Sequence, residues 1–354
     1  MTAKKVAKKK AAKKAGKKAA KKTTNKVAMK KAVKKVDPTA LLAEHFRRVD
    51  LADLARRPLE ELFQRQRELP EEDDVPFVLT GQYKKALELL ADADVTGLFP
   101  VLIGPPGTGK TTLCRYYAQL RGKTTGNDSF SWMTFDESTR PAHMIGGFDP
   151  AVAINKGFCF EAYEPGPLVV AMLRGGIFVA NEINRATEYT QNSLLEPLEE
   201  RSVRVPHLGR FRASEGFFFV AAMNPSEIAG THRLSEALKD RLRVWIKLDY
   251  PDKRTEMEII RKNTPQYGLP DALLDDVHRL VAATREHSQV EVPASLRAGI
   301  AITRLASVLL KTDAGLDERE ALRQSASHVL LGAVKPKPGV KPEAVVEKII
   351  HASL

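Results

Sequence analysis

The feature that most constrains this chain is the octapeptide GPPGTGKT at residues 104–111, which satisfies every fixed position of the pattern G-x-x-x-x-G-K-[ST]. The apolar run at residues 98–103 precedes it and predicts a short buried strand, and residues 111–120 after it have the spacing of a helix. Glycines between a strand and a helix let backbone amides and the helix N-terminus approach an anion closely. The motif and its context therefore predict a loop that holds the phosphates of a nucleotide.

The residues of this loop have expected parts in that binding. Gly104, Gly107 and Gly109 permit a close backbone approach. Lys110 supplies a positive charge, and the Thr111 hydroxyl is a ligand for Mg²⁺. The complete set of candidate nucleotide-binding residues is Gly104, Pro105, Pro106, Gly107, Thr108, Gly109, Lys110, Thr111 and Thr112.

Positive charge is concentrated in residues 1–36. This segment holds sixteen lysines and no acidic residue, so the net charge of +12 for all 354 residues becomes −4 for residues 37–354. It repeats Ala-Lys-Lys units, contains no aromatic residue and repels itself, which predicts a disordered tail. Its composition resembles the lysine-rich tails of linker histones, and its charge suits DNA or another polyanion. A solubilising tail, or one that binds an acidic protein, is the alternative.

The sequence lacks the patterns typical of secreted, membrane-spanning or disulfide-bonded proteins. No apolar segment follows the lysines as it would in a signal peptide, and no run of about 18 apolar residues predicts a membrane span. Cys114 and Cys159 are too few for a disulfide framework, lack the spacing of a metal site, and are expected to be buried thiols. We expect a cytoplasmic protein, associated with the nucleoid if the tail binds DNA.

The remainder of the chain divides into three segments. Residues 37–75 predict two short amphipathic helices and an acidic linker. Residues 76–250 contain the glycine-rich loop and apolar strands of parallel type, which predicts an α/β domain with helices wound around a parallel sheet. Residues 251–354 predict a helical lid domain. Its helices are expected at residues 254–262, 271–286, 295–310, 318–331 and 343–353, with an exposed proline-rich loop at 335–342.

Two further apolar strands end in polar residues. The strand at residues 175–180 leads into Asn181 and Glu182, and the strand at residues 216–222 leads into Asn224. In an open parallel sheet ligands bind outside the carboxyl ends of the strands, so these side chains should face the phosphates. Polar residues also end buried strands for structural reasons, and the order of the motifs along the chain is what favours a functional interpretation.

These motifs together resemble the AAA+ superfamily of P-loop ATPases, and within it the MoxR type. The resemblance extends over about residues 76–310. It rests on residues 104–111, 163–168, 181–186, 191–200, 222–225, 234–242 and 295–298, which occur in the order typical of the family. It implies an AAA+ parallel-sheet domain with a helical lid, ATP as the nucleotide with Mg²⁺, and a ring of identical subunits that is usually hexameric.

The resemblance also implies roles for four residues outside the loop. Glu182 corresponds to the base that polarises the attacking water, and Asn224 corresponds to the sensor-1 residue. Arg241 resembles the arginine finger that reaches the ATP of a neighbouring subunit, and Arg297 resembles the sensor-2 arginine of the lid. An arginine supplied in trans stabilises charge on the transferred phosphoryl group, so such a site is complete only at a subunit interface.

One position departs from the family pattern. The strand that ends in Glu182 normally carries Asp before the Glu, where it orients Mg²⁺ through the metal's water shell, and here that residue is Asn181. Asn181 and Thr111 are the candidate residues around Mg²⁺. An amide keeps a hydrogen-bonding oxygen but lacks the negative charge, which weakens the contact with Mg²⁺. The sequence thus favours a weakened ATPase, with an inactive one as the alternative.

Two hairpins are expected to contact the substrate of the ring, either a protein or a nucleic acid. The resemblance implies that residues 147–166 form a β-hairpin, and its expected tip at residues 151–155 is apolar and suits a protein client. The second hairpin, residues 202–213, is basic through Arg204, Arg210, Arg212 and the preceding Arg201. It is suited to a nucleic-acid backbone, although a solvated basic hairpin has the same composition.

Three functions are compatible with these features. The first is an ATP-dependent chaperone that remodels a protein client, with a separately encoded von Willebrand factor A partner, as in related proteins, and a tail that tethers it to DNA or another polyanion. The second is a DNA-associated motor that uses the basic hairpin. The third is a nucleotide-gated scaffold that hydrolyses little ATP because of Asn181. The whole set of motifs favours the chaperone, and charge alone favours the motor.

Overall fold

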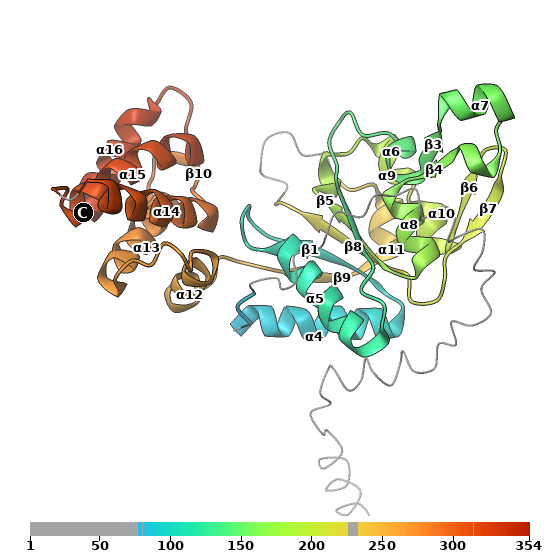
Figure 1. Ribbon diagram of the computed structural model, residues 1–354, viewed down its shortest axis with the longest axis horizontal. Coiled ribbons are helices and arrows are strands. Elements are labelled where there is room, and N and C mark those ends of the chain that lie inside the picture. Colours follow the sequence, from blue (N-terminus) through green and yellow to red (C-terminus); the bar gives the residue numbers. More distant parts are fainter. Residues whose placement is uncertain (1–76, 80, 226–232, 314) are drawn as a thin grey trace, which may run out of the picture.

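The computed structural model of the protein describes residues 77–79, 81–225, 233–313 and 315–354. They form a body built on a β-sheet, within residues 77–248, and a body of helices, within residues 253–354 (Figure 1). We refer to them as the sheet body and the helical body. The predicted tail and the predicted helices of residues 37–75 lie outside the described residues.

The sheet body contains a five-stranded sheet in the order β2-β5-β8-β1-β9. Every neighbouring pair of its strands is parallel, which confirms the predicted α/β fold. The strands are β1 Phe99–Ile103, β2 Phe130–Thr134, β5 Ile177–Asn181, β8 Phe218–Met223 and β9 Leu242–Lys247. The register pairs Ile103 with Met223 and Asn181 with Ala222, so the carboxyl ends of β1, β5 and β8 meet at one edge of the sheet.

Helices cover this sheet and bury its central strands. They are α4 Gly81–Thr96, α5 Lys110–Thr125, α6 Pro141–Ile145, α8 Pro167–Arg174, α9 Glu188–Asn192, α10 Leu195–Glu199 and α11 Glu236–Arg241. Every residue of β8 is buried, as are the first four of β5, because side chains of a central parallel strand meet helices on both faces. The first four residues of β5 and the whole of β8 are therefore continuously apolar. This pattern is what predicted two buried parallel strands.

A buried ion pair ties the helix after the glycine-rich loop to its neighbours. The Arg121 guanidinium on α5, 1% exposed, lies 3.2 Å from an Asp94 oxygen on α4, and the Tyr117 hydroxyl donates to the same oxygen at 2.7 Å. Arg121 also donates to the carbonyl of Gly216, just before β8. Burial and the adjacent carboxylate raise the pKa of Tyr117 well above its usual value. The network holds α5 against α4 and β8. Because α5 begins at the loop, it also positions the loop.

The first predicted hairpin is present, but its tip differs from the prediction. Strand β3 Gly146–Phe148 pairs antiparallel with β4 Tyr163–Pro165. Residues 151–155, expected as the tip of a β-hairpin, instead belong to helix α7 Pro150–Lys156. Asp149 caps this helix by accepting from the backbone amides of residues 151 and 152, and proline suits the first helical position. The helix carries Ile154, which is 85% exposed.

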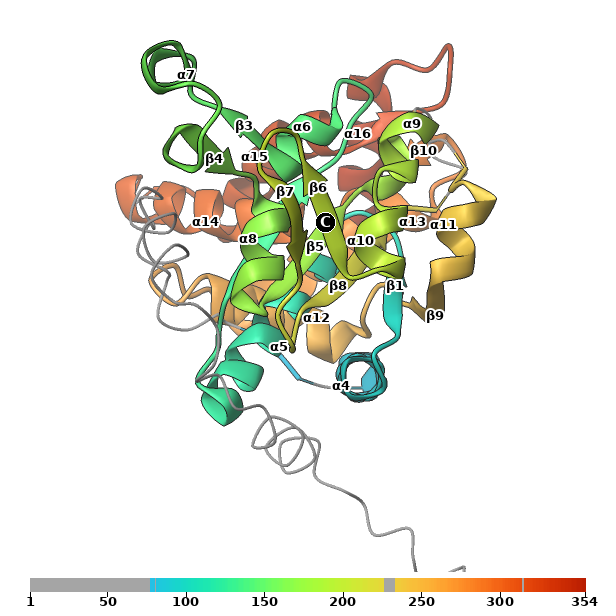
Figure 2. The same cartoon turned by 90° about the vertical axis from the view of Figure 1, so that its right-hand side faces the viewer.

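The second predicted hairpin is confirmed and contacts the first. Strand β6 Ser202–Val205 pairs antiparallel with β7 Gly209–Arg212. His207 in its turn stacks on Phe158, which follows α7, with ring centroids 4.6 Å apart. Both hairpins lie at the end of the sheet body away from the helical body (Figure 1). Helix α7 projects from that end (Figure 2).

The helical body confirms the five helices predicted after residue 251. They are α12 Lys253–Asn263, α13 Asp271–Glu286, α14 Leu296–Thr312, α15 Glu318–Ala333 and α16 Pro342–Ser353. The segment expected as a proline-rich loop includes a two-residue strand, β11 Lys335–Pro336, that pairs with β10 Val290–Val292. The body has its own hydrophobic core, which begins at Ile260, whereas the core of the sheet body ends at Leu248. This separation supports a domain boundary near residue 250.

The two cysteines differ in burial. Cys114 is fully buried, as expected, whereas Cys159 is only half-buried. No helix in the described part of the chain is both long enough and apolar enough to cross a membrane.

Candidate nucleotide-binding site

The glycine-rich loop connects β1 to α5 at the sheet edge where the strands end. A Cβ at Gly104 would lie 2.3 Å from the backbone oxygen of Leu248, so the chain can pass here only as glycine. A Cβ at Gly107 would lie 2.4 Å from that of Ser295, and Gly107 also has a φ of +78°, which disfavours any other residue. The loop therefore packs between Leu248, just after β9, and Ser295, just before α14 of the helical body.

Lys110 lies at the centre of the site. Its side chain is nearly buried, and its Nζ donates to the carbonyls of Gly104 at 2.7 Å and Pro105 at 2.9 Å. A third bond, of 3.0 Å, goes to Oδ1 of Asn224 just after β8. Burial lowers the pKa of Lys110 to about 8, while the Glu182 carboxylate acts in the opposite direction. A direct hydrogen bond thus joins the loop to the residue that follows β8.

Asn181 and Thr111, the two candidate residues around Mg²⁺, also contact each other. The Thr111 hydroxyl donates to Oδ1 of Asn181 at 3.4 Å, and Nδ2 of Asn181 donates to the Thr134 hydroxyl on β2 at 3.2 Å. Both partners are hydroxyls, which can either donate or accept. The hydroxyls of Thr111 and Thr134 can therefore bond either an amide or a carboxylate at position 181.

Glu182 follows in a left-handed conformation, with φ 55° and ψ 37°. Such a conformation costs a non-glycine residue about 1 kcal/mol or more and is found most often at functional sites. Its carboxylate lies 2.5 Å from Nε of Arg185. The adjacent Asn184 donates through Nδ2 to the Asn224 carbonyl at 3.1 Å. Sequence reasoning missed Arg185 and Asn184, although both belong to a motif that it used.

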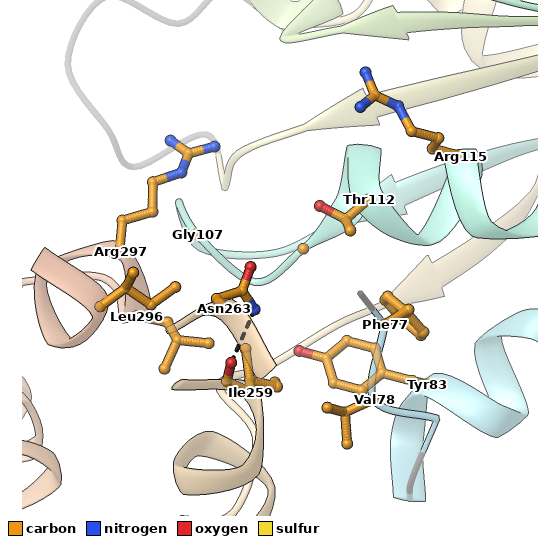
Figure 3. Close-up of a pocket in the computed structure, with 12 residues that line it drawn as sticks. Phe77, Val78, Tyr83, Gly107, Thr112, Arg115, Ile259, Asn263, Leu296 and Arg297 are labelled. Atoms are coloured by element: carbon orange, nitrogen blue, oxygen red, sulfur yellow. Dashed lines mark hydrogen bonds between the residues drawn. The ribbon is translucent and has the colours of Figure 1, made fainter. Parts of the chain in front are cut away.

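A cavity of about 290 Å³ lies beside the loop, between the sheet body and the helical body (Figure 3). Its walls come from three distant parts of the sequence. They are Phe77, Val78 and Tyr83 before and in α4, Gly107, Gly109, Thr112 and Arg115 of the loop and α5, and Ile259, Asn263, Leu296, Arg297 and Ile300 of the helical body. One end is formed by glycine backbone and the other mainly by apolar side chains, which suits the phosphates and the base of a nucleotide respectively.

Arg297 lies at this cavity and Arg241 does not. Arg297 extends from the start of α14 beside Gly107, and its charge further lowers the pKa of Lys110 (Figure 3). Arg241 at the end of α11 is held by Glu199, with 2.6 Å between nitrogen and oxygen, and by Asp240. Of the predicted catalytic residues, Glu182, Asn224 and Arg297 thus surround the loop, whereas Arg241 faces a different part of its own chain.

The residues around the loop fit a nucleoside triphosphate with Mg²⁺. Helix α5 has no side-chain cap at Gly109 and no acidic residue in its first turn, so its first backbone amides are available to an anion. The buried Lys110 ammonium adds a positive charge beside them. Bound Mg²⁺ supplies charge neutralisation at the phosphates. The Thr111 hydroxyl and the Asn181 amide would hold that metal, and Glu182 and Asn224 would orient water.

Comparison with known proteins agrees with this geometry. Residues 100–242 match the family described as AAA domain (dynein-related subfamily). This part of the chain is therefore similar to AAA domains. The match covers β1, the glycine-rich loop, β5 with Glu182, and β8 with Asn224, and it ends just after Arg241. The predicted resemblance to MoxR-type AAA+ proteins is confirmed.

Similarity to curated relatives extends beyond residues 100–242. The chain is 29% identical over 225 residues to the uncharacterized protein YeaC of Bacillus subtilis, covering 57% of this chain and 66% of that one. It is 28% identical to the gas vesicle ATPase GvpN of Haloferax mediterranei, covering 54% and 57%. It is 30% identical to the chaperone MoxR1 of Mycobacterium tuberculosis, covering 61% and 59%. The chain thus spans less than two thirds of the length of each of these relatives.

The lowered pKa of Lys110 predicts how nucleotide affinity depends on pH. Below about pH 8 the ammonium is charged in the free protein, and above that pH binding must take up a proton to restore the charge. The affinity for ADP without Mg²⁺ should therefore fall with rising pH, by about tenfold per pH unit once Lys110 is deprotonated. Calorimetric titration between about pH 7 and pH 9.5, in buffers of different ionisation enthalpy, measures both the affinity and the proton uptake.

Lys110→Arg is the matched control, because a guanidinium keeps its charge over this whole range. Its affinity, whatever its absolute value, should not follow this pH dependence. A native protein whose ADP affinity is constant up to pH 9.5, with no proton uptake, would contradict the assignment.

Proposed function

We propose that the protein is an ATP-hydrolysing AAA+ ring of the MoxR type that remodels a protein client. The observation that carries the proposal is the bond between the buried Lys110 ammonium and Asn224, which joins the nucleotide loop to the water-positioning strand end. Glu182 lies next to this pair in a strained conformation typical of functional sites. ATP and Mg²⁺ are the ligands that this arrangement suits.

The proposed ring follows from the position of Arg241. Within one chain Arg241 contacts Glu199, Asp240 and the carbonyl of Ala237, and it is not among the residues that line the cavity. A phosphoryl-transfer site is greatly accelerated by an arginine that reaches the terminal phosphate. A second copy of the chain that presents its Arg241 to this cavity would complete the site. A hexamer is the ring size that the family implies.

A protein client is supported by the apolar end of the sheet body. Ile154 is 85% exposed and Phe158 is 57% exposed at the tip of the first hairpin, and large exposed apolar side chains commonly bind other proteins. The similarity to the chaperone MoxR1 agrees with such a role. A separate von Willebrand factor A protein is the partner proposed to act with this surface in the cytoplasm. The DNA motor has less support, because Arg210 of the basic hairpin is paired with Glu196.

The mixing of two inactive variants tests the shared site. Arg241→Ala should leave ATP affinity largely intact and lower turnover by about 10³-fold or more, because the finger acts on the neighbour's transition state. Lys110→Ala removes the loop cation of the same chain. Rings that contain both variants have some intact sites, and they should regain part of the ATPase rate measured in a coupled assay.

Arg243→Ala is the matched control for Arg241. Arg243 lies two residues away, is 65% exposed, and pairs with the same Asp240 at 3.8 Å. Its turnover should equal that of the native protein. If Arg241→Ala loses no more turnover than Arg243→Ala, or if mixed rings of the two inactive variants recover nothing, the proposed interface is wrong.

The neutral Asn181 favours a second candidate, a scaffold in which nucleotide controls assembly and little ATP is hydrolysed. Asn181→Asp distinguishes it from the weakened ATPase. The hydroxyls of Thr111 and Thr134 can both donate to a carboxylate at this position, so the variant should keep the fold. We expect a higher ATPase rate and a lower Mg²⁺ concentration for half-maximal activity. An absence of hydrolysis by both forms, in assembled rings with client, favours the scaffold.

The tail at residues 1–36 is proposed as a tether to DNA or another polyanion, which would place the protein at the nucleoid. Residues 37–354 carry a net charge of −4, so deletion of the tail should abolish most binding to unrelated DNA duplexes and spare nucleotide binding. A salt titration of the affinity for both forms measures this. Equal DNA affinity with and without the tail would show that DNA binds to another part of the chain.

A further inference from the structure

The apolar end of the nucleotide cavity contains one polar side chain from the helical body, that of Asn263. It is the last residue of α12, and the cavity wall around it includes Ile259, Leu296 and Ile300 (Figure 3). The Tyr83 hydroxyl on the opposite wall donates its hydrogen to the carbonyl of Thr108 at 3.2 Å. Asn263 is therefore the side chain best placed to distinguish one base from another.

The orientation of the Asn263 amide follows from its hydrogen bond. Nδ2 donates to the backbone carbonyl of Ile259 at 2.8 Å. A carbonyl can only accept, so the nitrogen has to face Ile259 and the oxygen has to face the other way. Figure 3 shows this oxygen pointing toward the glycine-rich loop across the cavity. Within the described part of the chain, no hydrogen bond is made to this oxygen, which leaves it as an acceptor directed into the cavity.

Neighbouring contacts hold this residue in place. The Arg304 guanidinium on α14 donates to the backbone carbonyl of Asn263 at 2.9 Å. The preceding residue, Lys262, donates through Nζ to the carbonyl of Phe77 at 3.2 Å, which ties the end of α12 to the opposite wall of the cavity. An acceptor fixed in this way loses little entropy when it binds a donor.

We propose that Asn263 selects adenine, by accepting a hydrogen bond from the exocyclic amino group of the base. Guanine carries a carbonyl oxygen at the corresponding ring position, so two acceptors would face each other there. The inference rests on the proposed nucleotide site and adds to it the residue that sets base specificity. Because Asn263 belongs to the helical body, the same bond would link the base to that body while the loop of the sheet body holds the phosphates.

Binding of three diphosphates tests this without hydrolysis. Calorimetry on the full chain compares ADP with purine riboside diphosphate, which lacks only the exocyclic amino group, and with GDP. The native protein should prefer ADP to purine riboside diphosphate by about tenfold, the value of one good hydrogen bond. In Asn263→Leu this preference should disappear, mainly through weaker ADP binding, and the preference for ADP over GDP should fall by about tenfold.

Two further variants make the outcome decisive. Asn263→Ala should give the same loss of preference, and the unfolding temperatures of both variants show that they remain folded. Tyr83→Phe, on the opposite wall, should keep the native ratio of ADP to purine riboside diphosphate affinity. An unchanged ratio in Asn263→Leu, or a ratio lost in Tyr83→Phe instead, refutes the selection of adenine by Asn263. If the native protein binds none of the three diphosphates, the nucleotide site itself is refuted.

Discussion

The buried ammonium of Lys110 is the interaction on which the candidate site depends. It joins the carbonyls of the glycine-rich loop to Asn224 at the end of β8, so one charge fixes the two segments that must surround a nucleotide. Burial of this charge is unfavourable, and the pKa of Lys110 falls to about 8 as a result. A phosphate group beside the ammonium would offset that cost. The folded loop is thus electrostatically prepared for an anion before any anion binds.

The sequence predicted the central part of this arrangement because it is locally encoded. Apolar runs without alternation identify central parallel strands, and the polar residue after each run must lie at the carboxyl edge of the sheet, as Asn181 and Asn224 do. The base end of the cavity could not be predicted in this way. Phe77, Tyr83 and Asn263 come from segments up to 186 residues apart, and only tertiary packing brings them together.

The helix α7 at the tip of the first hairpin was not predicted, and it has a local cause. The apolar composition of residues 151–155 was interpreted from the hairpin that the resemblance implied, while Asp149 and the proline after it form a helix start of their own. The position of Arg241 could not be interpreted from one chain for a different reason. Its motif was recognised, yet within one chain Arg241 is bound to Glu199. The partner proposed for it, a nucleotide on a neighbouring subunit, would lie outside its own fold.

Asn181 changes the balance of charge at the site in a consistent direction. Lys110, Arg115 and Arg297 place positive charge around the loop and the cavity, and the Glu182 carboxylate is paired with Arg185. With an amide at position 181, the site has one negative charge fewer than the family pattern provides. Attraction for phosphates is thereby strengthened, and attraction for Mg²⁺ is weakened. The slower hydrolysis proposed for Asn181 would prolong the nucleotide-bound state. In the proposed ring, assembly would then persist longer than each hydrolysis event requires.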